Sequence, residues 1–312
     1  MRHRPVTCGR PWVDRGHQAR RLRQIAVGVV LLLAADAALV SEASGTAFAA
    51  ATGTTVAAEA ASDSAGALGP AEAQDEASAV LMARLQNRKI EVLSARSSDS
   101  TTYALPSGES QTEAFAGPVR VRQGGVWKDI DTSLSDTGAD LTPAAVVADV
   151  AVSDGGDTQL ASVTKGQESF GLGWEDKLPA PKVKDSTATY DLGSGQTLSV
   201  TALAQGFSEN LTLAQQPAGN TTSYRIPLSL HGLKVSQADS GHLLLKDSDG
   251  KLVAEAPAPM MWDASKDPAS GESAHQEQVA TEIETAADGA QTLVLTPDQA
   301  FMETATYPVT VS

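Results

Sequence analysis

Short apolar stretches that alternate with polar residues run from residue 90 to the C-terminus, and turn-forming residues separate many of them. The segments 154–157 and 247–250, rich in aspartate and glycine, are such turns. A two-residue period is typical of β-strands, and no helical pattern alternates with these stretches, which argues against a parallel α/β sheet. The sequence therefore predicts a mainly β chain. Residues 90–312 are expected to form an antiparallel β-sandwich, either one large sandwich or two consecutive ones that divide near residues 215–222.

The apolar residues between the turns give the expected strand positions. An early strand is expected at 101–105, because a proline, a serine and a glycine follow it and mark a turn. The other strands are expected at 146–153, 158–164, 168–174, 187–192, 197–204, 208–214, 223–230, 233–237, 242–247, 251–255, 279–285, 291–295 and 307–311.

The clearest hairpin surrounds a pair of glycines, Gly124 and Gly125, which supply the positive φ angles that a two-residue turn needs. This turn places Arg120 opposite Asp129 and places an arginine opposite Trp127. One face of the hairpin is then apolar, whereas the other carries the charged side chains and the indole of Trp127. An exposed ion pair between Arg120 and Asp129 is expected on that second face.

The last expected strand, 307–311, carries apolar residues at alternate positions, which point to one face. Pro308 has no N–H, so its position must be an edge or an unpaired site. We expect this strand to dock with its apolar face inward on the sheet that contains residues 291–295.

The first 49 residues are expected to be a secretory signal peptide. Seven arginines lie within residues 1–24, an apolar run of eleven residues follows at 25–35, and Ala-Phe-Ala ends at Ala49. Basic, apolar and small residues in this order predict cleavage between Ala49 and Ala50. The alternative is a membrane anchor, but a spanning helix needs about 20 apolar residues and Asp36 interrupts the run.

Residues 50–69 are expected to be a disordered linker. The stretch 50–80 holds twelve alanines and no basic or aromatic residue. Such a composition buries too little apolar area to offset the entropy of ordering the chain.

A short helix is expected within residues 70–89, at about 71–88. Pro70 suits the first helical position, and acidic residues near the start and basic residues near the end complement the helix dipole. Ala77, Leu81 and Leu85 recur every four residues with Val80 beside them, so these four residues are expected to form the buried face.

Charge and cysteine content exclude several classes of protein. A formal net charge of −15 argues against a nucleic-acid-binding protein, which needs a basic face. Cys8 is the only cysteine, which excludes a disulfide framework within the chain and a four-cysteine zinc site. Signal cleavage would also remove Cys8.

The sequence contains no recognisable catalytic constellation, so no enzymatic activity is expected. His231, His242 and His275 lack partners at metal-ligand spacing, and no G-x-S-x-G motif is present. No cofactor is expected. The acidic turns 154–157 and 247–250 are interpreted as ordinary turns, with calcium binding by their carboxylates as the alternative.

Aromatic residues make up only 4% of the chain and are scattered. Most of them, including Trp174 and Trp262, are therefore expected in the core, since tryptophan is highly buried on average. Trp127 is the exception, because its hairpin register places it on the charged face. It is the one residue predicted to take part in surface binding.

From about residue 82 onwards the chain resembles the N-terminal non-repeat module of actinobacterial secreted proteins that carry DNRLRE, LamG-like jellyroll or Rhs (YD-repeat) domains downstream. Two runs that carry the resemblance are Trp127-Lys-Asp-Ile-Asp-Thr132 and Ala256-Pro-Ala-Pro-Met-Met-Trp262-Asp263. The others lie at 117–122, 178–181, 188–190, 200–208, 232–233 and 307–309. The chain departs from the pattern at 192–196, and it stops at residue 312 where the relatives continue. The resemblance supplies no catalytic residues.

The expected protein is therefore an exported, non-enzymatic β-sandwich head module of a wall-associated or secreted Rhs/LamG-type protein, with a role in presentation, assembly or adhesion. Its expected partners are cell-wall glycan or downstream repeat domains, with no nucleic acid and, after signal cleavage, no membrane. The alternatives are a carbohydrate-binding or glycan-processing extracellular protein and, third, an extracellular inhibitor or toxin-shielding shell.

Overall fold

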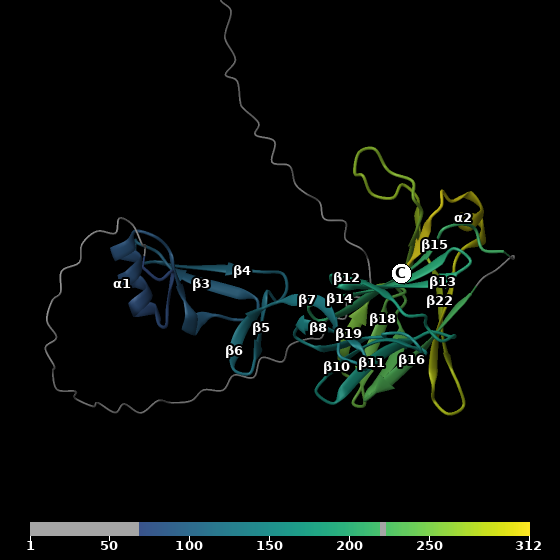
Figure 1. Ribbon diagram of the computed structural model, residues 1–312, viewed down its shortest axis with the longest axis horizontal. Helices are drawn as coiled ribbons and strands as arrows, with labels where there is room; N and C mark the ends of the chain where they lie inside the picture. Colours follow the sequence, from purple (N-terminus) through teal and green to yellow (C-terminus); the bar gives the residue numbers. More distant parts are fainter. Residues whose placement is uncertain (1–68, 219–222) are drawn as a thin grey trace, which may run out of the picture.

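The computed structural model describes residues 69–218 and 223–312, which form a mainly β protein (Figure 1). The expected signal peptide, its cleavage site at Ala49 and Ala50, and nearly all of the expected linker lie outside the described residues. Within the described residues, no helix is both long and apolar enough to cross a membrane.

The N-terminal unit is a four-stranded sheet covered by one helix. Its core consists of small and β-branched residues, among them Ala79 and Ala83 of the helix and Ile90 of the sheet. The strand order is β1-β2-β3-β4, with β1 parallel to β2 and the other pairs antiparallel. The elements are β1 (Glu72–Ala73), α1 (Glu76–Gln86), β2 (Ile90–Val92), η1 (Leu93–Ala95), β3 (Ser100–Ala104) and β4 (Ser110–Ala114).

The helix begins later than the sequence predicted. Asp75 caps it, with its Oδ1 accepting the Ser78 N–H at 2.9 Å. The preceding residues instead form β1, and the Glu91 N–H donates to the Ala71 carbonyl at 2.9 Å. The prediction of a helix at 71–88 was therefore wrong at its start, because these residues satisfy their backbone groups in a sheet.

The buried face of α1 also differs from the predicted one. Leu81 and Leu85 are 60% and 77% exposed, whereas Ala79 and Ala83 are fully buried. The alanine side chain is smaller than that of leucine. The helix can therefore approach the sheet more closely through the face that carries Ala79 and Ala83 than through the face that carries Leu81. The sequence showed an apolar period but not which of its two faces the sheet would cover.

Residues 131–311 form a β-sandwich of two large antiparallel sheets, and a smaller third sheet shares its hydrophobic core (Figure 1). The eight-stranded sheet has the order β22-β23-β16-β11-β10-β9-β8-β7. The seven-stranded sheet has the order β12-β13-β14-β15-β24-β20-β21. One hydrophobic core lies between them and contains residues from both sides of 215–222, such as Leu213 and Tyr224.

The expected strands are present with shifts of a few residues, whereas β7, β8, β12, β20 and β21 were not expected from the sequence. The eight-stranded sheet contains β7 (Asp131–Asp136), β8 (Leu141–Ala145), β9 (Asp149–Val152), β10 (Gln159–Lys165), β11 (Glu168–Gly173), β16 (Tyr224–His231), β22 (Ala280–Thr285) and β23 (Gln291–Thr296). The seven-stranded sheet contains β12 (Lys182–Lys184), β13 (Thr187–Gly193), β14 (Gln196–Leu203), β15 (Gly206–Leu213), β20 (Met260–Trp262), β21 (Gln276–Gln278) and β24 (Val309–Val311). The third sheet consists of β17 (Leu233–Gln237), β18 (Leu243–Asp247) and β19 (Leu252–Ala256).

Alternate residues of the two large sheets point inward and pack together. Phe170 of β11 stacks on Phe207 of β15, with ring centroids 6.3 Å apart. The β7 strand packs beside the other sheet at one side, where the Leu134 N–H donates to the Asp185 carbonyl at 2.9 Å. A short helix that the sequence did not reveal, α2 (Gln299–Thr304), precedes the last strand and buries Phe301.

The last strand, β24, lies in the interior of a sheet and not on the sheet that was predicted. It lies between β15 and β20 in the seven-stranded sheet, whereas residues 291–295 belong to the other sheet. Val309 and Val311 point inward as predicted, with 0% and 2% exposure. Pro308 precedes the paired residues, so its missing N–H removes no ladder bond and the strand does not need an edge.

Glu209 of β15 is a carboxyl group buried within the sandwich. Burial raises the pKa of Glu209 to about 7, and its Oε2 has no hydrogen-bond partner. The side chain borders a small cavity of about 10 Å³, which is room for about one water molecule. The Tyr224 hydroxyl, also unpartnered, borders the same cavity, and burial raises the pKa of Tyr224 to about 12.

We expect Val311→Ala to lower the free energy of unfolding of the sandwich by about 2 kcal/mol, because it removes two buried methyl groups and leaves a cavity. Val183→Ala on the exposed strand β12 is the matched control, and we expect it to change stability by less than about 0.5 kcal/mol. Urea unfolding of the purified chain measures both values. Equal effects of the two substitutions would contradict the interior position of β24.

We expect the sandwich to lose stability as the pH rises from about 5 to about 8. The folded state holds the Glu209 proton with a pKa of about 7 against an ordinary value of 4.5. The resulting stabilisation is complete below the ordinary pKa and is lost as the pH rises through the folded-state value. The total loss in the free energy of unfolding is roughly 3 kcal/mol.

Urea unfolding across this pH range measures the loss in the purified chain. Glu209→Gln removes the titrating group, so its stability should change less with pH than that of the unaltered chain. Glu277→Gln on the exposed strand β21 is the control and should retain the full pH dependence. Identical pH profiles for the unaltered chain and Glu209→Gln would show that Glu209 does not titrate in this range.

Candidate functional site

The hairpin predicted around Gly124 and Gly125 is present with the predicted register. It consists of β5 (Arg120–Gln123) and β6 (Val126–Asp129), and Arg122 faces Trp127 across the two strands. The two glycines have φ values of 58° and 83°, as a type I′ turn requires. The local turn chemistry therefore fixes which side chains share a face of the hairpin.

Arg120 faces Asp129 across the hairpin, but its side chain has other partners. Its guanidinium donates to the carbonyls of Ser97 and Ser100 at 3.1 and 3.0 Å, and to the Thr101 hydroxyl. The predicted pairing of the two residues is confirmed, whereas the expected ion pair is replaced by these bonds. Arg120 thus holds the hairpin against the turn that precedes β3.

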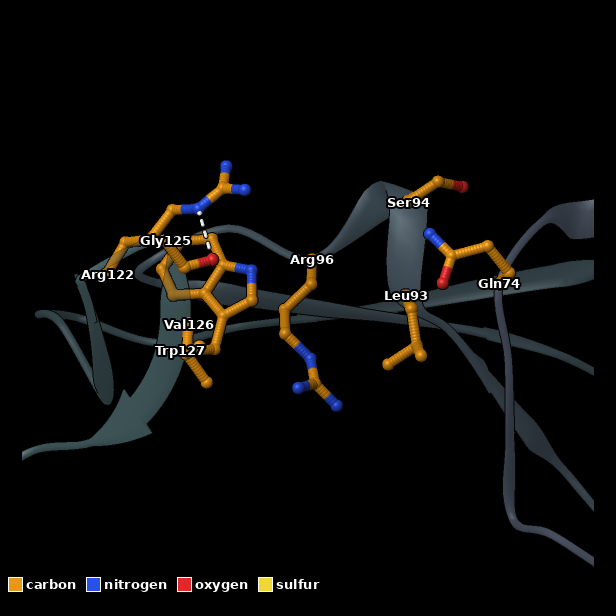
Figure 2. Close-up of a pocket in the computed structure, with 8 residues that line it drawn as sticks. All are labelled: Gln74, Leu93, Ser94, Arg96, Arg122, Gly125, Val126 and Trp127. Carbon is orange, nitrogen blue, oxygen red and sulfur yellow. Dashed lines mark hydrogen bonds between the residues drawn. The ribbon is translucent and has the colours of Figure 1, made fainter.

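A cleft of about 450 Å³ lies between this hairpin and the N-terminal unit (Figure 2). The hairpin forms one wall and presents Trp127 and Arg122. The other wall consists of Gln74, which follows β1, and of the turn η1. The Ser94 N–H of η1 donates to the Gln74 carbonyl at 3.0 Å and joins these two segments. The residues that line the cleft are Gln74, Leu93, Ser94, Arg96, Arg122, Gly125, Val126 and Trp127.

Trp127 is half-buried and lies between the two arginines of the cleft (Figure 2). The Arg122 guanidinium carbon is 6.0 Å from the centre of the indole, at the limit of a cation–π contact. Leu93 and Val126 add aliphatic surface, while Gln74 and Ser94 offer hydrogen-bond donors and acceptors. The cleft thus combines a flat apolar surface with polar groups around it.

The charge of Arg96 is compensated by two carboxylates. Its Nε lies 2.7 Å from Glu91 and one terminal nitrogen lies 3.2 Å from Glu72. The hydrogen bond from Arg96 to Glu91 is the main cause that raises the pKa of this arginine, and burial opposes it. Arg96 therefore has a fixed position in the wall of the cleft.

The sequence identified only part of this site. It placed Trp127 on the charged face and Arg122 opposite it, since both positions follow from the Gly-Gly turn. Gln74, Ser94 and Arg96 lie far from the hairpin in the sequence, and no local pattern marked them as its neighbours. The side-chain bonds of Arg120, with backbone bonds from the N–H groups of Val119 and Arg120 to the Ser98 carbonyl, hold the hairpin beside them.

The three described histidines do not form a catalytic or metal-binding cluster with one another. His231 is exposed and His242 pairs with Glu255 at the surface. His275 stacks on Phe301 at 4.2 Å, and its Nδ1 lies 3.6 Å from Asp263. In residues 69–218 and 223–312, no group of three histidine, cysteine or acidic side chains is arranged to hold a metal.

Asp263 organises a loop beside the last strand. One carboxylate oxygen accepts the Thr306 N–H at 2.8 Å, and the other accepts the N–H and hydroxyl of Ser265. Burial opposes ionisation, but these hydrogen bonds lower the pKa of Asp263 overall. The hydroxyls of Ser265 and Ser273 donate to Asp263 and to backbone carbonyls, which ties the loop together.

The two acidic turns use carboxylates to fix their own backbone. Asp157 accepts the Gln159 N–H at 3.1 Å, and Asp247 accepts the N–H groups of Asp249 and Lys251 at 3.0 and 2.9 Å. These bonds are typical of ordinary turns. Both segments therefore form turns between strands, as the sequence predicted.

Trp174 and Trp262 are half-buried in or beside the sandwich, where Trp174 packs against the core and stacks on Tyr224 at 6.4 Å. Of the three tryptophans in the described residues, Trp127 is the one that lines the large cleft.

We expect Arg120→Gln to loosen the hairpin, because the three hydrogen bonds of the guanidinium are lost. Each hydrogen bond of a charged group stabilises a folded protein by about 1.5–3 kcal/mol. Hydrogen exchange should accelerate in residues 97–101 and 119–130, while the sandwich keeps its protection. Arg122→Gln is the matched control, since Arg122 makes one such bond, from Nε to the Gly125 carbonyl at 3.1 Å. Equal exchange rates in both variants would exclude a positioning role for Arg120.

No family model, curated protein or solved structure matches this chain. What the cleft does is therefore inferred from its own side chains.

Proposed function

We propose that this chain is an exported, non-enzymatic β-sandwich module that adheres to glycan at the cell wall through the Trp127 cleft. The observation that carries the proposal is the half-buried indole in an open cleft of about 450 Å³ with polar groups at its margin. An indole face packs well against the apolar C–H face of a sugar ring. Gln74 and Ser94 both donate and accept hydrogen bonds, which suits sugar hydroxyls.

The proposal is for binding and not for glycan hydrolysis. Glycoside hydrolysis uses a pair of carboxyl groups on either side of the scissile bond. None of the eight residues that line the cleft is an aspartate or glutamate, and the two nearby glutamates that pair with Arg96 are engaged by it.

Export rests on the basic, apolar and small-residue order of residues 1–49, and the wider setting rests on the resemblance to modules of secreted Rhs/LamG-type proteins. A wall-associated module with a glycan-binding cleft would act in adhesion, presentation or assembly. Downstream repeat domains are the second proposed partner, because in the relatives a strand like 307–309 leads into the next domain.

We expect the purified chain to bind glycans on an array of cell-wall and plant polysaccharides, with and without calcium. Trp127→Ala should weaken binding at least tenfold, about 1.4 kcal/mol, because it removes the stacking surface. Trp127→Phe should retain part of the affinity. Phe115→Ala is the control, since Phe115 is 42% exposed and does not line the cleft.

The proposal fails if the unaltered chain binds no glycan. It also fails if Trp127→Ala and Phe115→Ala bind as well as the unaltered chain.

A further inference from the structure

The two arginines of the cleft differ in how their charge is balanced. Arg96 pairs with both Glu91 and Glu72, so its charge is more than balanced within the wall. Arg122 donates its Nε–H to the Gly125 carbonyl and, among the described residues, has no carboxylate partner. Of the two arginines that line the cleft, Arg122 is therefore the one whose guanidinium is free of a carboxylate.

The position of Arg122 ties this charge to the aromatic surface. Arg122 and Trp127 are a cross-strand pair, and the guanidinium carbon is 6.0 Å from the centre of the indole. The bond from Nε to the Gly125 carbonyl fixes the plane of the guanidinium, and Figure 2 shows its terminal nitrogens directed away from that bond. The guanidinium therefore lies beside the indole on which a ligand ring would stack.

A guanidinium with free terminal nitrogens binds carboxylate and phosphate groups through two parallel hydrogen bonds. The net charge of −15 does not prevent this, because charges farther away than about 10 Å are largely screened at ordinary ionic strength. Anion binding in the cleft therefore depends on the unpaired guanidinium of Arg122 and not on the net charge of the chain.

We infer that the cleft selects saccharides that carry an anionic group, a carboxylate or a phosphate, which Arg122 binds while the sugar ring stacks on Trp127. Gln74 and Ser94 bind neutral hydroxyls from the opposite wall. This inference rests on the proposed function and adds the chemical class of the ligand. It separates the roles of the two residues, since Trp127 contributes affinity for the ring and Arg122 contributes the preference for charge.

Calorimetric titration of the purified chain tests the inference with three oligosaccharides of equal length: a neutral glucose oligomer, its glucuronate counterpart and a phosphate-bearing counterpart. The unaltered chain should bind at least one charged oligomer about tenfold more tightly than the neutral one. Comparison of glucuronate with phosphate shows which anion is preferred. The preference should shrink as salt is raised from about 0.01 to about 1 M, because the Arg122 charge is exposed to solvent.

Arg122→Gln should abolish the preference for charge while it leaves binding of the neutral oligomer within about twofold. Arg122→Lys should retain the preference in part, since lysine keeps the charge and loses the fork geometry. Lys182→Gln removes the same charge from an exposed strand far from the cleft in the sequence and should leave the preference unchanged. A melting curve for each variant establishes that the fold is intact.

Three outcomes overturn the inference. Equal affinity for charged and neutral oligomers, with binding still lost in Trp127→Ala, rejects the anionic class and leaves the proposed function standing. Absence of binding to every saccharide rejects both. An Arg122-dependent affinity for poly-glutamate that equals the affinity for the glucuronate oligomer would identify an acidic peptide, and not a sugar, as the ligand.

Discussion

The seven-stranded sheet holds together because β24 fills the space between β15 and β20. Its three residues pair with 211–213 on one side and 261–262 on the other, and Met260 and Ser312 exchange two backbone hydrogen bonds of 2.9 Å. Strands β20 and β21 join the sheet only through β24. The two inward valines of β24 also complete the core, so sheet continuity and core packing depend on the same short segment. Since its partners on β15 lie about a hundred positions earlier, this contact carries a large loop-closure entropy.

Charge protects the outer strands of the two large sheets. The edge strand β12 consists of Lys182, Val183 and Lys184, all exposed, and the edge strand β22 carries the exposed residues Glu282 and Glu284. Charged side chains at an edge discourage pairing with another chain. Part of the acidity of the protein, at β22, therefore has a structural reason that is independent of any ligand.

The hairpin could be predicted from its local sequence, whereas contacts between segments far apart in the sequence could not. The Gly-Gly turn determined that Arg122 faces Trp127, because the turn type fixes the register. The helix period did not show whether Ala79 or Leu81 would be buried, since that depends on how closely the sheet approaches. The sheet that β24 joins, and the approach of Arg96 and Gln74 to Trp127, depend on contacts between segments far apart in the sequence. Half of the candidate site was thus visible in the sequence, namely the half on the hairpin.

The described chain contains two separate hydrophobic cores, and the cleft belongs to the smaller one. The sandwich core is built from many leucines, valines and aromatic residues, whereas the N-terminal core consists of four alanines with one isoleucine and one valine. Far less apolar area is buried there, so this unit gains less from the hydrophobic effect. We therefore expect the N-terminal unit, and with it one wall of the cleft, to unfold at a lower temperature than the sandwich. A sample whose circular dichroism is still that of a β-protein would then already have lost the cleft.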